Sequence, residues 1–341
     1  MDIVTQGLLG GVLAQTVAGQ NEKKLASFIG VFAGLLADAD ILIRSADDPL
    51  LNIEFHRHFS HSLLFVPFGA AIAMLLLWPF VHRHITITRL YLFCLLGYSL
   101  SGVLDAFTSY GTLLFWPFSD ERIAWRLISI IDPVFTLIIL ITFIAGLRLK
   151  VKKIAYVGLS FAIAYMGLGY FQIQRAESLA SELIQSRNHL AVRQIVKPTL
   201  GNNILWRSVY IYDDRIYVDA VRVSLFSKNT IYEGSSVPLF KVEKVLPGLS
   251  TDSILRKDIQ RFASFSDNYV AMSISQKNVL GDLRYSMLAN STKPLWGIII
   301  DETKPQQHAE YRFFRNRDQA VRKTFINMLL GRCAAVECPP N

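Results

Sequence analysis

Long apolar segments fill the first half of this chain and constrain its fold more than any other feature. Six of them approach the ~20 apolar residues that are needed to cross the hydrocarbon core of a bilayer. They cover residues 7–19, 27–43, 62–81, 89–107, 128–147 and 154–171. Hydrophobic residues make up 52% of the 341 positions, which is high for a soluble protein. The sequence therefore predicts a membrane α-helical bundle of about six apolar helices over residues 1–171, although the short first segment is also compatible with a re-entrant turn.

The composition changes near Phe171, and residues 172–341 are predicted to form a separate, extramembrane α+β domain with a soluble composition. Helical spacing of apolar residues predicts an amphipathic helix over 174–193. Two alternating runs around Asp213-Asp214-Arg215 predict a β-hairpin. Further strands are expected at 268–275, 283–288 and 295–300, and a last helix at 317–330.

Basic residues in the turns predict the orientation of the bundle, because cytoplasmic loops carry an excess of Lys and Arg. Alternate turns hold Lys23, Lys24, Arg83, Arg89, Arg148, Lys150, Lys152 and Lys153, and the other turns hold only Arg44, Arg57, Arg122 and Arg126. This asymmetry predicts a multi-pass protein of a bacterial-type inner (plasma) membrane. With six crossings, loops 44–61 and 108–127, both termini and residues 172–341 face the periplasm or the cell exterior. The first six residues lack the basic start of a signal peptide, so the first apolar segment is expected to be retained.

The formal charge of +8 does not predict a nucleic-acid partner. The basic residues lie in turns or are scattered, and no basic stripe alternates with aromatic residues. Three cysteines are too few for a disulfide framework. Cys94 is expected in the core, whereas Cys333 and Cys338 are equally compatible with a small disulfide-closed loop and with two unpaired thiols.

Acidic residues and histidines gather at one predicted face of the bundle. Asp38 and Asp40 end the second apolar segment, three histidines follow in the next loop, and Asp105 ends the fourth segment on the same side. A charged group at membrane depth costs about 2.5 kcal/mol or more, so it is rarely kept there without a function or a partner. A divalent metal ion would neutralise several carboxylates at once. The competing interpretation is a set of polar helix ends at the lipid–water interface.

The spacing of these residues limits how they can share one ion. Asp38 and Asp40 point about 200° apart on an α-helix, so both reach one metal only if the helix ends or unwinds there. His56 and His61 suit a loop or helix-start site for neutral imidazole ligands. His58 is expected to be peripheral. Interfacial histidines that reach toward water are the ordinary alternative.

Further polar residues follow in the predicted outer loops. Asp105 is a candidate ligand and a candidate base that activates the attacking water. Hydroxyl groups that could bind a phosphate or the ligating carboxylates belong to Ser62, Thr108, Thr112 and Ser119. A turn rich in Ser and Thr is, however, ordinary. Asp132 before Pro133 is expected either to cap the fifth helix or to support the site.

Taken in order, these residues resemble a known family. The pattern is Asp38-x-Asp40, His56-Arg57-x-x-Ser60-His61-Ser62, Asp105-x-x-Thr108-x-Tyr110-Gly111-Thr112, Trp116-Pro117-Phe118-Ser119 and Asp132-Pro133. It resembles the YdjM-like group of predicted membrane-bound metal-dependent hydrolases, which is distantly similar to zinc-dependent phospholipases C. The likeness covers about residues 1–170. The chain departs from it at Gln6 and Ser101, where many members have His, and at Ala37, where many have Pro.

The resemblance implies a metal-dependent hydrolase at the outer face of the inner membrane, and it favours a lipid-like or phosphoester substrate. The expected cofactor is a divalent metal, Zn²⁺ or Mn²⁺, on ligands from Asp38, Asp40, His56, His61 and Asp105. Asp105 and Arg57 are the expected catalytic residues, and membrane lipids are the expected surroundings. The alternative is a non-enzymatic membrane scaffold whose outer domain binds an envelope protein. A transporter fits less well, because the ionisable residues lie at helix ends rather than mid-span.

Overall fold

The computed structural model describes residues 1–225, 227–315 and 318–332, and it divides into two compact units. The first unit comprises Met1–Ile43, Phe55–Phe171 and Leu200–Asn202. The second comprises Arg44–Glu54, Gln172–Thr199 and Asn203–Asn341. Cys333 and Cys338 lie outside the described residues, and Cys94 is buried as a free thiol.

The first unit is helical and apolar. Its helices are α1 (Ile3–Val17), α2 (Lys23–Leu36), α4 (Val66–Val81), α5 (Ile87–Ser99), α6 (Ser101–Ala106), α7 (Pro133–Leu149) and the first part of α8 (Lys152–Ser186). Four helical stretches of the described chain are long and apolar enough to cross a membrane: Lys23–Leu42, Leu63–Val81, Ile87–Ala106 and Lys152–Ser186. The helices α1 and α7 are apolar but shorter. The structure therefore supports four spans, and six crossings remain a prediction.

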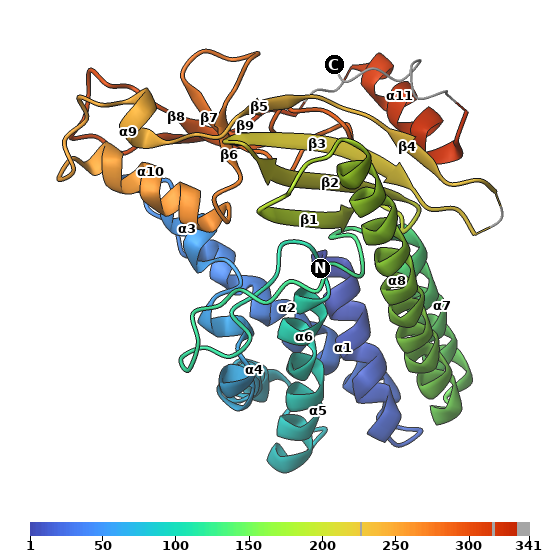
Figure 1. Ribbon diagram of the computed structural model, residues 1–341. Helices are drawn as coiled ribbons and strands as arrows, with labels where there is room; N and C mark the ends of the chain where they lie inside the picture. Colours follow the sequence, from blue (N-terminus) through green and yellow to red (C-terminus); the bar gives the residue numbers. More distant parts are fainter. Residues whose placement is uncertain (226, 316–317, 333–341) are drawn as a thin grey trace. The chain divides into compact units, whose positions relative to one another are not determined.

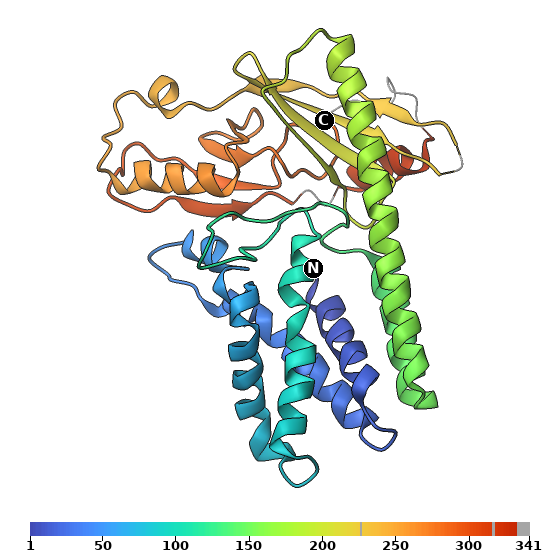
Figure 2. The ribbon, with the colours of Figure 1, turned by 60° about the horizontal axis from the view of Figure 1, so that its bottom comes forward.

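Small residues let three helices of this unit pack closely. A Cβ atom on Gly30 of α2 would lie 2.5 Å from the carbonyl oxygen of Gly10 on α1, and one on Gly97 of α5 would lie 2.5 Å from the carbonyl of Gly30. Ala14, Ala26 and Ala33 are fully buried in the same core. Close backbone approach of this kind stabilises helix association where no hydrophobic effect operates. Figure 2 shows these helices in blue and teal, with α4 beside α5.

The second unit holds two antiparallel sheets. The first has the order β1-β2-β3-β4, with β5 also paired to β3, and consists of β1 (Arg193–Pro198), β2 (Leu205–Tyr212), β3 (Arg215–Arg222), β4 (Thr230–Tyr232) and β5 (Ser236–Pro238). The second has the order β6-β7-β8-β9, made of β6 (Val270–Met272), β7 (Val279–Asp282), β8 (Trp296–Ile299) and β9 (Glu310–Phe313). Its helices are α9 (Val242–Val245), α10 (Ile254–Phe265) and α11 (Gln319–Leu330), and α3 (Leu51–Phe55) begins in it (Figure 1).

The predicted hairpin is confirmed. Tyr212 pairs with Arg215, and the two turn residues Asp213 and Asp214 have φ values of 47° and 54°. Two positive φ angles define the tight turn that matches the twist of a hairpin. The strand expected at 295–300 corresponds to β8, and the last helix corresponds to α11.

Two expected elements are wrong. The separate helix over 174–193 does not exist, because α8 runs without a break from Lys152 to Ser186, and the chain enters β1 at Arg193. The strand expected at 283–288 is displaced to β7, which ends at Asp282. The Asp282 side chain accepts a hydrogen bond from the Arg284 backbone N–H at 2.9 Å, which turns the chain out of the strand.

Candidate metal centre

Two acidic residues enter the centre where a helix changes its winding. The α-helix α2 ends at Leu36, and a 3-10 helix, η1 (Ala37–Leu42), continues it. The condition under which both carboxylates could reach one metal, a helix that ends or unwinds at this point, is therefore met. Both Asp38 and Asp40 are buried, at 8% and 4% exposure. An α-helix would point these two carboxylates in different directions. The change to a 3-10 helix brings both into the same buried region.

The second contribution comes from the chain before α4. His61 ends a short 3-10 helix, η2 (Phe59–His61), and is 1% exposed. Arg57, two residues before η2 begins, has φ 59°, an uncommon value for a residue with a side chain. Its backbone N–H donates to Asp40 Oδ2 at 2.8 Å, and its carbonyl accepts from the Thr112 hydroxyl at 3.1 Å. These bonds hold the unusual conformation in place.

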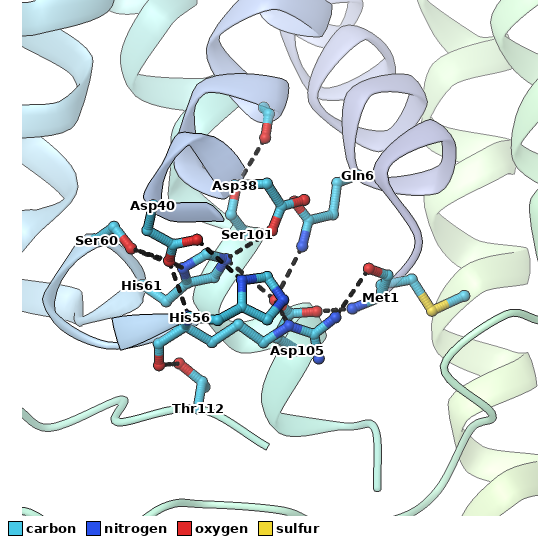
Figure 3. A network of polar contacts seen from close by, with 12 residues as sticks. Met1, Gln6, Asp38, Asp40, His56, Ser60, His61, Ser101, Asp105 and Thr112 are labelled. Atoms are coloured by element: carbon cyan, nitrogen blue, oxygen red, sulfur yellow. Dashed lines mark hydrogen bonds and ion pairs between the residues drawn. The ribbon is translucent and has the colours of Figure 1, made fainter. Parts of the chain in front are cut away.

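Asp105 completes the group from α6. His61 Nε2 lies 3.3 Å from Asp38 Oδ1 and 3.1 Å from Asp105 Oδ2. Figure 3 shows the three side chains close together. Asp38 lies near the end of the first candidate span, His61 lies just before the second, and Asp105 lies near the end of the third. Because successive spans run in opposite directions, these three positions meet at one end of the bundle. The predicted convergence of Asp38, His61 and Asp105 is therefore seen.

Asp40 acts differently from its neighbour, because its oxygens are taken by donors. Oδ1 accepts from His56 Nδ1 at 3.0 Å. Oδ2 accepts from the Arg57 backbone N–H and from the Ser60 hydroxyl at 2.6 Å, and it lies 3.2 Å from His61 Nδ1. A carboxylate that receives this many donors orients the groups around it.

The Ser60 hydroxyl fixes which nitrogen of His61 carries a proton. Its single hydrogen is donated to Asp40, because a carboxylate only accepts. At the 3.0 Å contact between Ser60 Oγ and His61 Nδ1, the hydrogen must then come from Nδ1. In the neutral imidazole, Nε2 is left with a lone pair.

That lone pair points at two carboxylates. Among the described residues, neither His61 Nε2 nor Asp38 Oδ1 has a hydrogen-bond partner, and both are buried. A lone pair facing carboxylate oxygens is repulsive unless a cation lies between them or the ring gains a second proton. Buried polar atoms without partners are rare and call for an explanation. The donor set of one imidazole and two carboxylates fits a divalent transition metal.

Other groups also reach Asp105. Gln6 Nε2 donates to its Oδ2 at 2.9 Å, Arg57 Nε lies 3.1 Å from the same oxygen, and the Met1 amino group forms an ion pair with Oδ1. Arg57 is 4% exposed and stacks over the Tyr110 ring, with 5.0 Å from its central carbon to the ring centroid. A buried guanidinium thus stands directly beside the carboxylates.

The two other histidines of the loop have distinct surroundings. His56 can join a second potential metal-binding group with Asp38 and Asp40. Burial lowers the pKa of His56, while its hydrogen bond to Asp40 acts in the opposite direction, so the balance favours the neutral ring. His58 Nδ1 accepts from the Phe59 backbone N–H at 2.8 Å and caps η2, and its ring lies against those of Phe55, Phe59 and Trp116.

The expected supporting residues divide into two sets. Thr108 accepts from Arg57 Nη1 at 3.3 Å, and Thr112 binds the Arg57 carbonyl, so both support the centre through Arg57. Ser62 bonds within its own turn and caps the 3-10 helix that precedes α4. Ser119 accepts from the Glu121 backbone N–H.

Asp132 has the capping role that was one of its two predicted functions. Its Oδ1 accepts from the Val134 and Phe135 backbone N–H groups, and Oδ2 accepts from the Tyr165 hydroxyl at 2.9 Å. It therefore begins α7, with Pro133 in the first turn.

Sequence reasoning missed two contributors. Gln6 was noted only as a departure from the family pattern, although an amide next to an apolar segment is itself a signal of a buried polar partner. Ser60 lies between His56 and His61, and its hydroxyl proved to determine the proton arrangement. At Ser101, the side chain instead bonds the Gly34 carbonyl at 3.5 Å.

An apolar helical bundle with a buried acidic and histidine centre defines an integral membrane protein. Comparison with known proteins then identifies its family. The chain belongs to the YdjM inner membrane protein family, whose model matches residues 1–176. A relative in Bacillus subtilis (strain 168), named "Uncharacterized protein YfhP", is 30% identical over 174 residues, which are 49% of this chain and 50% of the relative. The chain thus spans about half the length of that relative. No solved structure matches.

Proposed function

We propose that this protein is a membrane-bound metal-dependent hydrolase whose divalent cation is held by Asp38, His61 and Asp105. The observation that carries the proposal is the His61 Nε2 lone pair, buried against two carboxylate oxygens without a hydrogen-bond partner among the described residues. Zn²⁺ or Mn²⁺ suits this mixed set of ligands. Such an ion polarises a substrate oxygen and lowers the pKa of water.

The remaining residues of the centre have separate roles in this proposal. Asp40 is a positioning residue, since it fixes His61 through Nδ1 and holds His56 and Ser60 in place. His56, whose Nδ1 is engaged by Asp40, presents Nε2 as a further ligand atom. Arg57 stabilises the negative charge that develops in the transition state. Asp105 is both a ligand and the candidate base.

The surroundings of the centre favour a lipid-like phosphoester as the substrate. Arg57 and Arg122 lie on the Tyr110 ring at 5.0 and 5.2 Å, so two cationic groups lie near the candidate metal ligands and can attract an anion. The loop that follows α6 exposes Phe115, Phe118 and Trp125. Exposed aromatic residues are typical of the membrane–water interface. A substrate with an anionic headgroup and an apolar body would meet both features.

The proposed location of the protein is an inner (plasma) membrane. The family and the apolar helices support a membrane protein. Six crossings, a periplasmic or extracellular C-terminal half at residues 172–341 and an envelope protein as its partner are proposals that rest on the charge of the turns.

A second candidate is the non-enzymatic scaffold. Arg57 and the Met1 amino group both pair with Asp105, and an imidazolium at His61 would satisfy the rest without a metal. The centre would then be a buried ionic network that fixes the bundle.

A hydrolase assay tests the proposal and separates the two candidates. Detergent-purified protein is stripped with a chelator, reloaded with Zn²⁺ or Mn²⁺ and given chromogenic phosphodiesters and phospholipids. The proposal expects hydrolysis that depends on the metal, is lost in Asp105→Asn and persists in Asp213→Asn, which changes an exposed turn that accepts Asn equally well. Folded protein that binds metal yet hydrolyses nothing in the screen contradicts the hydrolase assignment.

A further inference from the structure

The segment between Asp40 and His56 packs with the C-terminal half of the chain. Arg44–Glu54 lies in the same compact unit as Gln172–Thr199 and Asn203–Asn341. Leu50 and Ile53 are buried, at 0% and 7% exposure. The piece of chain that joins two members of the candidate metal centre is therefore held by the second unit.

An arginine on α10 forms ion pairs with this segment. Arg261 Nε and Nη2 donate to the two carboxylate oxygens of Glu54, each at 2.7 Å. Nη1 and Nη2 donate to the two oxygens of Asp48 at 3.1 and 2.9 Å. Nη1 also donates to Asp258 Oδ1 at 2.9 Å. All five guanidinium hydrogens are thus used, on three carboxylates.

Asp258 keeps the guanidinium in place. It is fully buried, and it accepts from Arg261, from His308 Nδ1 at 2.9 Å and from the Ala309 backbone N–H at 2.9 Å. Asp48, Asp258 and His308 are close enough to hold a metal, but Arg261 already supplies the cation there and the Asp258 oxygens are engaged. The cluster is therefore a clamp. Figure 1 shows α10 beside α3, which carries Glu54.

The clamp is connected to the metal centre through a very short piece of chain. One residue, Phe55, separates Glu54 from His56, which limits the distance between their Cα atoms to about 7 Å. Glu54 lies in the helical turn of α3, and the His58 backbone N–H donates to the Phe55 carbonyl at 3.2 Å, so this connection is structured. At the other end, three residues lie between Asp40 and Arg44, which limits the distance between those two Cα atoms to about 14 Å.

We propose that Arg261 is a positioning residue of the metal centre, which it acts on by clamping Asp48 and Glu54 and so holding the chain between Asp40 and His56. The inference rests on the proposed metal site. It makes the C-terminal half a regulator of that site. A partner that draws segment 44–54 from α10 would weaken metal binding.

Substitution at Arg261 tests this with Co²⁺ as the probe. Arg261→Gln removes the charge and most donors, Arg261→Lys keeps the charge, and Glu54→Gln weakens the clamp without changing α10. Arg312→Gln is the matched control, because Arg312 pairs only with Glu310 in its own strand among the contacts described. The measurements are hydrogen exchange of residues 44–54, Co²⁺ affinity and the visible spectrum of bound Co²⁺.

The expected result is faster exchange of 44–54 and Co²⁺ affinity lowered about tenfold in Arg261→Gln, the lower end of effects for residues that orient metal ligands. The Co²⁺ spectrum should shift, Arg261→Lys should recover part of the affinity, and Glu54→Gln should move in the same direction. Arg312→Gln should match the parent protein. Unchanged Co²⁺ affinity in both clamp variants overturns the positioning role alone. A parent protein that binds no Co²⁺ overturns the proposed metal site itself.

Discussion

A single hydroxyl decides the chemistry available at His61. Because Ser60 donates to Asp40, His61 must donate through Nδ1, and its other nitrogen faces Asp38 and Asp105. The sequence predicted that these three residues converge, since alternating span directions bring their positions to one end of the bundle. It did not predict the proton order or the contact from Gln6, because both depend on angles and distances that residue spacing does not determine.

The separate role of Asp40 leads to a graded prediction. Asp40→Asn keeps the shape but removes the charge that attracts four donors, so the imidazole of His61 is less firmly oriented. Metal affinity should fall about 10- to 100-fold without being abolished, as measured by competition with a chromogenic chelator. Asp47→Asn, in an exposed turn, should leave the affinity unchanged. Complete loss of binding in Asp40→Asn would instead identify Asp40 as a direct ligand.

At the scale of elements, the location of the apolar helices could be predicted and their continuity could not. The pattern placed a boundary between 154–171 and 174–193, yet no proline interrupts α8, which continues through Gly167 and Gly169 to Ser186. Likewise α10 was missed, although Ser253 caps it by accepting from the Arg256 backbone N–H. A change in the hydrophobic pattern therefore does not by itself mark the end of a helix.

Because α1 and α2 pack closely, replacing a glycine by alanine should lower the free energy of unfolding at Gly30 and raise it at Gly167. In Gly30→Ala the new methyl group would meet the Gly10 carbonyl, a backbone atom that cannot turn away, and the free energy of unfolding should fall by about 1–3 kcal/mol. Gly167→Ala in α8 is the control, since no described atom outside its own helix backbone lies within 4 Å. That variant should be more stable by about 0.4–1 kcal/mol. Equal effects in detergent unfolding would contradict the packing.

The stabilisation of segment 44–54 by its ion pairs with Arg261 should decrease as the pH falls. Burial raises the pKa of Asp48, but hydrogen bonds from Arg261 outweigh it and hold that pKa below the ordinary value. The stabilisation is then fully present above the unfolded pKa of about 3.9 and is lost as the pH falls through the folded pKa. Glu54, Asp258, Arg261 and His308 face the same group.

Hydrogen exchange of residues 44–54, corrected for the intrinsic rate, measures this dependence. Protection should stay constant from about pH 7 to pH 5 and decrease below about pH 4. Asp48→Asn should show less protection at neutral pH and a weaker decrease in acid. Protection that increases on acidification would contradict the assigned ion pairs.

At the scale of the whole molecule, composition alone separated an apolar half from a mixed half. It did not reveal that Arg44–Glu54, which lies between two apolar segments, packs with the C-terminal half. Arg261, more than 200 residues away in sequence, bonds Asp48 and Glu54 of that segment, and no local pattern encodes such a contact.

The expected orientation can be tested by labelling in spheroplasts. In a background without the three native cysteines, Asp120→Cys should react with a membrane-impermeant maleimide, because loop 108–127 is expected outside. His84→Cys, in a turn expected in the cytoplasm, should react only after permeabilisation. The reverse pattern would contradict the proposed orientation.

The central claim is that Asp38, His61 and Asp105 share one divalent cation, and elemental analysis of detergent-purified protein tests it most directly. The account predicts about one transition-metal ion per chain in the parent protein and in His58→Ala, since His58 belongs to none of the potential metal-binding groups of the described residues. It predicts loss of that ion in His61→Ala, with the helical content unchanged. A folded parent protein free of metal after Zn²⁺ and Mn²⁺ loading, or His61→Ala that retains a full complement, would contradict it.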